Sequence, residues 1–180
     1  MKFVKKWGGF CIFSALLLAA LGLFLWYTSR PVVLNPAELT QAEGHESYPG
    51  VELMLDITSY QMNFTLRNGS NDRLESGASV DQDQNLIDTP GVDVLLDGIW
   101  YNVPHKTYAS AGVGLELEPG NQVSIRASMS PYGKLPDGQY RLSFGYWKYT
   151  PEEDRTPLSQ RPFYVSCARF DIANGKYVSM

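Results

Sequence analysis

The sequence predicts an all-β fold, an antiparallel β-sandwich of about seven or eight strands, preceded by one transmembrane helix at the N-terminus. Three observations support this prediction. A long uncharged apolar run opens the chain, from Gly8 to Tyr27. Apolar and polar residues alternate from Val51 onward in short segments, which is typical of strands with one wet face. The dipeptide Asp97-Gly98 joins two of these segments and favours a tight hairpin turn.

The apolar run at residues 8–27 is close to the ~20 residues that a helix needs to cross a membrane. Three lysines lie within residues 1–7, before the run, and the positive-inside rule places them in the cytoplasm. Trp26 and Tyr27 close the run, where amphipathic rings fit the outer interface. We therefore expect a signal anchor, a single-pass protein of the cell membrane, with the C-terminal domain outside the cytoplasm.

A cleaved secretory signal is the alternative interpretation of the same run. Such a signal has an apolar stretch of roughly 7 to 15 residues and ends in small residues. This run is longer and ends in large apolar residues. The acceptable cleavage point lies after Gly22, with Ala20 two residues earlier. Cleavage there would release the domain as a secreted protein, so we expect the uncleaved anchor.

Composition limits the functions of the part that follows Arg30. Eleven of the 15 basic residues and all 19 acidic residues lie there, which gives a formal charge of −8. A surface of that sign repels nucleic acid, so no nucleic-acid partner is expected. Cys167 is the one cysteine beyond the apolar run, so the domain forms no internal disulfide. The roughly 150 residues are enough for one core.

The chain divides into successive segments after the apolar run. Residues 28–49 contain Pro31, Pro36 and Gly44 and are expected to form a linker or stalk. The β domain is expected over 50–172, and residues 173–180 are expected to form a C-terminal tail. The alternating segments that predict strands are, in chain order, 51–58, 60–67, 92–96, 99–103, 113–117, 123–129, 140–146 and 163–172.

Two turns carry sequence signals of their own. Asp97 and Gly98 tolerate the positive φ angles of a type I′ turn, and Trp100 follows on the second strand of that hairpin. The run from Leu135 contains Gly138 and then Tyr140. A tyrosine just after such a corner resembles the tyrosine corner of sandwich domains, in which its hydroxyl bonds back to the turn.

Three stretches together, Phe64–Ser70, Asp97–Pro104 and Leu135–Phe144, resemble a family of bacterial immunoglobulin-like domains found in Gram-positive surface proteins. The shared features are an Asn-rich turn, a Gly-x-Trp-Tyr-x-Val-Pro arm and a Leu-Pro-x-Gly-x-Tyr-Arg turn. The resemblance implies an immunoglobulin-like sandwich over about Val51 to Ile172, without catalytic residues. It implies structural roles for Asp97, Gly98, Trp100, Gly138 and Tyr140.

Trp147 and Tyr149 are the candidate binding residues. In a regular strand they lie on the face opposite Tyr140, Leu142, Phe144 and Tyr146. An exposed aromatic pair there would stack on a sugar ring or on a partner's side chain. The alternative is that the acidic loop that follows covers both rings, because large apolar patches are rarely left exposed.

The sequence offers no catalytic or metal-binding constellation. His45 and His105 are the two histidines, and neither is paired in sequence with a nucleophile or a set of metal ligands. Asp81, Asp83 and Asn85 have the spacing of a calcium loop, but Leu86 takes the place of the required glycine. We therefore expect no enzyme, no cofactor and no metal.

The expected function is a non-enzymatic binding or spacer module at the cell surface or envelope, with an unidentified protein or cell-wall partner. Two alternatives stay open. One is a domain that recognises a glycan or solute through exposed aromatic side chains. The other is an accessory subunit of a membrane complex.

Overall fold

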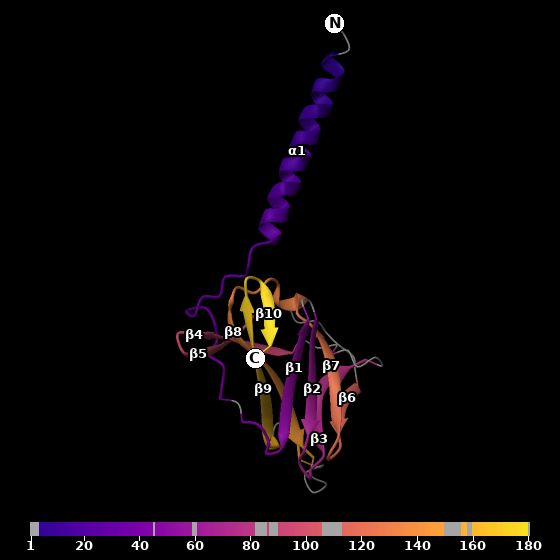
Figure 1. The fold of residues 1–180 in the computed structure, drawn as a ribbon, viewed down its shortest axis with the longest axis vertical. Helices are drawn as coiled ribbons and strands as arrows, with labels where there is room; N and C mark the ends of the chain where they lie inside the picture. The colour runs from indigo at the N-terminus through magenta and orange to yellow at the C-terminus, as the bar shows by residue number, and fades with distance from the viewer. Residues whose placement is uncertain are drawn as a thin grey trace. The chain divides into compact units, whose positions relative to one another are not determined.

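The structure is a computed structural model (Figure 1) that describes residues 4–44, 46–58, 61–81, 86, 90–105, 113–149, 156–157 and 160–179. The chain forms two compact units, Met1–Val32 and Val33–Met180. We call the second one the β unit. Each unit is described by itself.

The first unit contains helix α1, Val4–Thr28. Its side chains are described from Phe13 to Trp26, and the large apolar ones among them are mostly exposed, including Leu18 and Leu23 at 66% each. Within the described residues, no helix is both long enough and apolar enough to span a membrane. The membrane span over 8–27 stays a prediction.

The β unit confirms the predicted all-β class, with its strands in two antiparallel sheets (Figure 1). The small sheet has the order β1-β2-β7, and the large sheet has the order β10-β9-β8-β3-β6, with β4 paired to β8 and β5 to β4. The described residues form ten strands rather than the predicted seven or eight. They are β1 (Val51–Thr58), β2 (Gln61–Asn68), β3 (Leu74–Val80), β4 (Gly91–Leu96), β5 (Ile99–Asn102), β6 (Val113–Leu117), β7 (Gln122–Ser128), β8 (Gly138–Lys148), β9 (Phe163–Ala173) and β10 (Lys176–Ser179).

The core lies between the two sheets and follows the alternation of the sequence. Met62, Phe64 and Leu66 of β2 are at most 1% exposed. The four alternate residues of β8 from Tyr140 to Tyr146 are at most 4% exposed, and the Phe64 and Phe144 rings lie 5.3 Å apart. Burying a side chain of this size stabilises a fold by roughly 1.5 to 3 kcal/mol, so these two strands hold the sheets together.

Two strands lie where the sequence analysis expects none. β3 is short of large apolar residues, and it forms because it pairs with β6 on one side and with the end of β8 on the other. β10 lies inside the predicted tail. It pairs with β9 across a turn in which Asn174 and Gly175 have φ angles of 53° and 69°.

Part of the predicted linker is paired with the large sheet. The Ala42 amide donates to the Trp100 carbonyl at 2.9 Å, which extends the β5 edge by one more segment. The Val165 amide of β9 donates to the Glu46 carbonyl at 3.0 Å. Leu34, among the partly buried residues, packs against the core, so the residues after Val33 belong to the β unit.

The two turns singled out in the sequence have distinct geometries. Asp97 and Gly98 have φ angles of 50° and 80° and join β4 to β5, with Leu96 opposite Ile99. The Tyr140 hydroxyl, which is fully buried, donates to the Pro136 carbonyl at 2.7 Å. This is the hydrogen bond by which a tyrosine corner fixes the entry into a strand.

Candidate binding surface on the large sheet

The candidate surface lies on the outer face of the large sheet, where β8 and β9 pair. Trp147 lies directly opposite Phe163 in the register of these strands. The two ring centroids are 4.9 Å apart and the planes are tilted by 52°. Trp147 is half-buried, whereas Phe163 is 55% exposed. We call this pair the outer aromatic pair.

A glycine makes room for the Phe163 ring of the outer aromatic pair. A Cβ atom at Gly145 would overlap the Phe163 ring, so the ring lies directly on the backbone of β8. A Cβ atom at Gly77 of β3 would lie 3.6 Å from the Trp147 ring, an ordinary van der Waals distance, so the Trp147 ring does not require that glycine. Removing side chains beneath a ring lowers it onto the sheet, which fixes its orientation while one face stays in water.

Tyr149, the second residue predicted to bind, is held by Arg73. The Tyr149 amide donates to the Arg73 carbonyl at 2.8 Å, and the Arg73 guanidinium lies 4.8 Å from the centre of the Tyr149 ring. Both Trp147 and Tyr149 are half-buried. The acidic residues 152–154 of the loop expected to cover them lie outside the described residues.

Charged side chains surround a small depression beside Trp147. This depression has a volume of about 270 Å³, and Glu75 and Glu116 contribute to its lining. Arg73 forms ion pairs with Glu75 at 3.6 Å, with Glu116 at 2.5 Å and with Glu118 at 3.8 Å. Arg161 pairs with Glu75 at 3.7 Å. Among the described residues, three carboxylates thus share two guanidinium groups, so carboxylates outnumber basic groups in these ion pairs.

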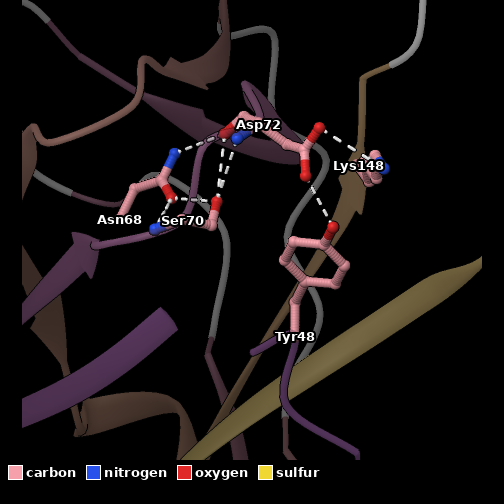
Figure 2. Close-up of polar contacts among 5 residues, drawn as sticks. All are labelled: Tyr48, Asn68, Ser70, Asp72 and Lys148. Carbon is pink, nitrogen blue, oxygen red and sulfur yellow. Dashed lines mark hydrogen bonds and ion pairs between the residues drawn. The ribbon is translucent and has the colours of Figure 1, made fainter. Parts of the chain in front are cut away.

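A polar cluster lies where the end of the predicted linker meets β8 (Figure 2). The Tyr48 hydroxyl donates to Asp72 Oδ2 at 2.6 Å, and Lys148 Nζ lies 3.3 Å from Asp72 Oδ1. The hydrogen bond from Tyr48, together with Lys148, holds the pKa of Asp72 below its ordinary value. Nothing in the sequence indicated this cluster, because its members are far apart in the chain.

Asn68 occupies the same region in Figure 2 and is completely buried. Its Nδ2 donates to the carbonyls of Asp72 at 2.8 Å and Leu117 at 3.1 Å. Its Oδ1 accepts from the amide of Ser70 at 3.1 Å and from the hydroxyl of the same residue at 2.6 Å. These contacts close the turn between β2 and β3, so the role of Asn68 is structural.

Trp100 lies at another part of the large sheet, beside a buried ion pair. The Arg141 guanidinium is 4.6 Å from the centre of a Trp100 ring. Arg141 Nε donates to Asp93 Oδ2 at 2.7 Å, and the two side chains are 13% and 3% exposed. This arrangement fastens β5 and β4 to β8, which agrees with a structural role for Trp100.

Among the described residues, the structure brings together no metal-binding cluster, and the Cys167 thiol is not activated. No group of three or more His, Cys, Asp or Glu side chains among them is placed to hold a metal ion. Burial and the nearby Asp93 raise the pKa of Cys167 to about 11, against the opposing effect of two arginines. The thiol is therefore protonated at neutral pH, and protonated thiols are poor nucleophiles. His45, Asp83 and Asn85 lie outside the described residues.

Comparisons with protein-family models, with curated proteins and with solved structures find no match to this chain. Phe163 is the functional candidate that the sequence analysis missed. Its pairing with Trp147 depends on the register between β8 and β9. The one signal in the sequence was Gly145, because a glycine inside a strand can mark a place where another group lies close to the backbone.

Proposed function

We propose that this chain is a membrane-anchored, extracytoplasmic immunoglobulin-like domain that binds a protein partner and carries out no catalysis. The observation that carries the proposal is the outer aromatic pair, Trp147 and Phe163, at the end of the β8–β9 pairing, with the Phe163 ring seated on the backbone of Gly145. The partner presents apolar side chains to these rings and basic groups to the neighbouring glutamates.

The anchor and the immunoglobulin-like class belong to the same proposal. The apolar side chains of α1 from Phe13 to Trp26 are mostly exposed, and burial in lipid would remove their contact with water. Two packed antiparallel sheets and the hydrogen bond from Tyr140 to Pro136 support an immunoglobulin-like arrangement.

The ring geometry favours a protein partner over a glycan. Sugar rings stack on flat aromatic faces, whereas Trp147 and Phe163 are tilted by 52° and Tyr149 is covered on one face by Arg73. Half-buried aromatic residues surrounded by charged groups are typical of the centres of protein interfaces. The excess of carboxylates around Arg73 adds charge complementarity to a basic partner.

Site-specific photocrosslinking in the native cells tests the proposal. A benzophenone amino acid at position 163 should capture one discrete protein species, and the same probe at position 54 should not. Met54 provides the matched control because it is 45% exposed but lies on β1 of the small sheet. Capture should disappear when Trp147→Ser is added. Equal capture from both positions, or capture of wall glycan alone, would overturn the protein-binding proposal.

Protease treatment of intact protoplasts tests the topology separately. The β unit should be digested while a membrane-retained fragment containing α1 survives. Full protection of the β unit would refute the proposed orientation, and release of an intact β unit into the medium would indicate cleavage after Gly22.

A further inference from the structure

A second feature of the β unit, a groove at one end of the two sheets, has no part in the proposed protein-binding surface. One side of the groove is formed by the end of β7 and by the turn that follows it, which includes the short helix Ser130–Tyr132. The other side is formed by the turn from β9 into β10. Its volume is about 990 Å³, at the upper end of the range typical of small-molecule sites.

The floor of the groove is apolar and belongs to the core. Met129, Leu135 and Ile172 line it while being only 3 to 4% exposed. Tyr177 of β10 forms part of the wall, and its pKa is raised by burial. A ligand in this groove would therefore meet apolar core side chains beneath it, contributed by the residue after β7, the segment before β8 and β9.

Among the described residues that line the groove, the charged ones are all basic. They are Arg126, Lys134 and Lys176. This is a local reversal of charge, because the chain beyond Arg30 carries 19 acidic residues against 11 basic ones. Asp137 does not line the groove, but its carboxylate lies behind the wall, where it accepts from the amides of the lining residues Asn174 and Gly175 at 2.8 and 2.9 Å.

We propose that this groove binds a small anionic amphiphile, a molecule with one carboxylate or phosphate group and an apolar body. The apolar body would lie on the floor formed by Met129, Leu135 and Ile172. The anionic group would meet the lysines and the arginine, which form charge-assisted hydrogen bonds with carboxylates and phosphates. Such a group can arrive as a free molecule or as the headgroup of a membrane lipid.

Methyl NMR of the full chain in nanodiscs of zwitterionic lipid tests the proposal, with methionine methyl groups labelled. Met129 reports on the groove, and Met54, exposed on β1, provides an internal control. Dissolved decanoate should shift the Met129 signal in a saturable way and leave Met54 unchanged. Decanol, which has the same apolar chain without the charge, should bind on the order of tenfold more weakly.

Variants separate a specific site from unspecific partitioning into apolar surfaces. The triple variant Arg126→Gln, Lys134→Gln, Lys176→Gln should weaken decanoate binding at least about tenfold. Arg67→Gln is the matched control, because Arg67 is an exposed arginine on β2 that does not line the groove. An unchanged Met54 signal in each variant verifies that the fold is retained.

A second arm distinguishes the two sources of the anion. This arm uses nanodiscs in which a quarter of the lipid is anionic, without added decanoate. The Met129 signal should shift if the ligand is a lipid headgroup and should stay unchanged if the ligand is a free molecule. Either result supports the proposal when decanoate binds. The proposal is overturned if neither decanoate nor anionic lipid shifts Met129. It is also overturned if decanol binds as well as decanoate or if the triple variant binds like the original chain. None of these results depends on Trp147 or Phe163.

Discussion

Replacing Asn68 with alanine should destabilise the β unit strongly. The side chain makes four hydrogen bonds in a site without solvent contact, two as donor to the carbonyls of Asp72 and Leu117 and two as acceptor from Ser70. Alanine removes all four and leaves the Leu117 carbonyl without this donor. At about 1 kcal/mol net for each bond, the free energy of unfolding should fall by roughly 3 to 4 kcal/mol.

Urea unfolding of the β unit, followed by far-UV circular dichroism and tryptophan fluorescence, measures this loss by linear extrapolation. A loss of that size corresponds to a decrease in melting temperature of about 6 to 16 °C for a unit of this length. It is also a large fraction of the roughly 5 to 15 kcal/mol that stabilises a typical domain.

Asn63→Ala provides the matched control on the same strand. Asn63 Oδ1 is buried but accepts no hydrogen bond from the described residues, so its removal should change stability by less than about 1 kcal/mol. Equal losses for the two variants, or a loss below about 1 kcal/mol for Asn68→Ala, would refute the argument that these hydrogen bonds hold the turn.

Three further predictions concern single side chains of the β unit. Tyr140→Phe should cost about 1 to 2 kcal/mol in urea unfolding, because the ring is kept but the bond to Pro136 is lost; an unchanged midpoint would contradict a role for the corner. The pKa of Asp72 is lowered in the folded chain. The Asp72 carboxylate therefore stabilises the fold at a pH above its pKa in the unfolded chain, and this stabilisation is lost as the pH falls through its pKa in the folded chain. Tyr48→Phe should reduce this loss of stability in acid and should raise the pKa of Asp72 measured by NMR titration. An unaltered titration would exclude the Tyr48 hydrogen bond as the cause of the lowered pKa. Cys167 is partly exposed and has a pKa of about 11, so it should react with a disulfide reagent at pH 8 more slowly in the folded unit than after unfolding in urea, and equal rates would contradict the raised pKa.

Much of the fold follows from local patterns in the sequence. The segment predicted over 51–58 coincides with β1, and that predicted over 60–67 lies within one residue of β2. Alternating apolar residues determine these strands because each strand has one face in the core and one in water. Asp97-Gly98 likewise specifies its hairpin by the φ angles it tolerates.

The strands that were missed are formed by contacts between distant segments. β3 contains Gly77 and several polar residues, and its pairing with β6 and β8 compensates for a weak local preference. β10 was predictable, because Asn174-Gly175 is the same kind of hairpin signal as Asp97-Gly98. Its four residues follow the predicted end of the domain, where only a tail was expected.

One member of the outer aromatic pair, Trp147, could be predicted from the sequence, and the other could not. The period of β8 places Trp147 on the outer face, as the sequence indicates. The identity of its neighbour requires the register between β8 and β9, which places Phe163 opposite Trp147. That register is fixed by pairing along ten residues of each strand rather than by any short motif, so the sequence alone named Tyr149 instead.

The burial of Asn68 has a consequence for how this protein can be produced. Asn68-Gly69-Ser70 matches the acceptor pattern for N-linked glycosylation. The atom that would receive the sugar, Nδ2, donates to the carbonyls of Asp72 and Leu117 in the folded chain. An oligosaccharide attached during secretion from a eukaryotic host would therefore prevent the turn from closing. Bacterial expression leaves this amide unmodified and is the route compatible with the fold.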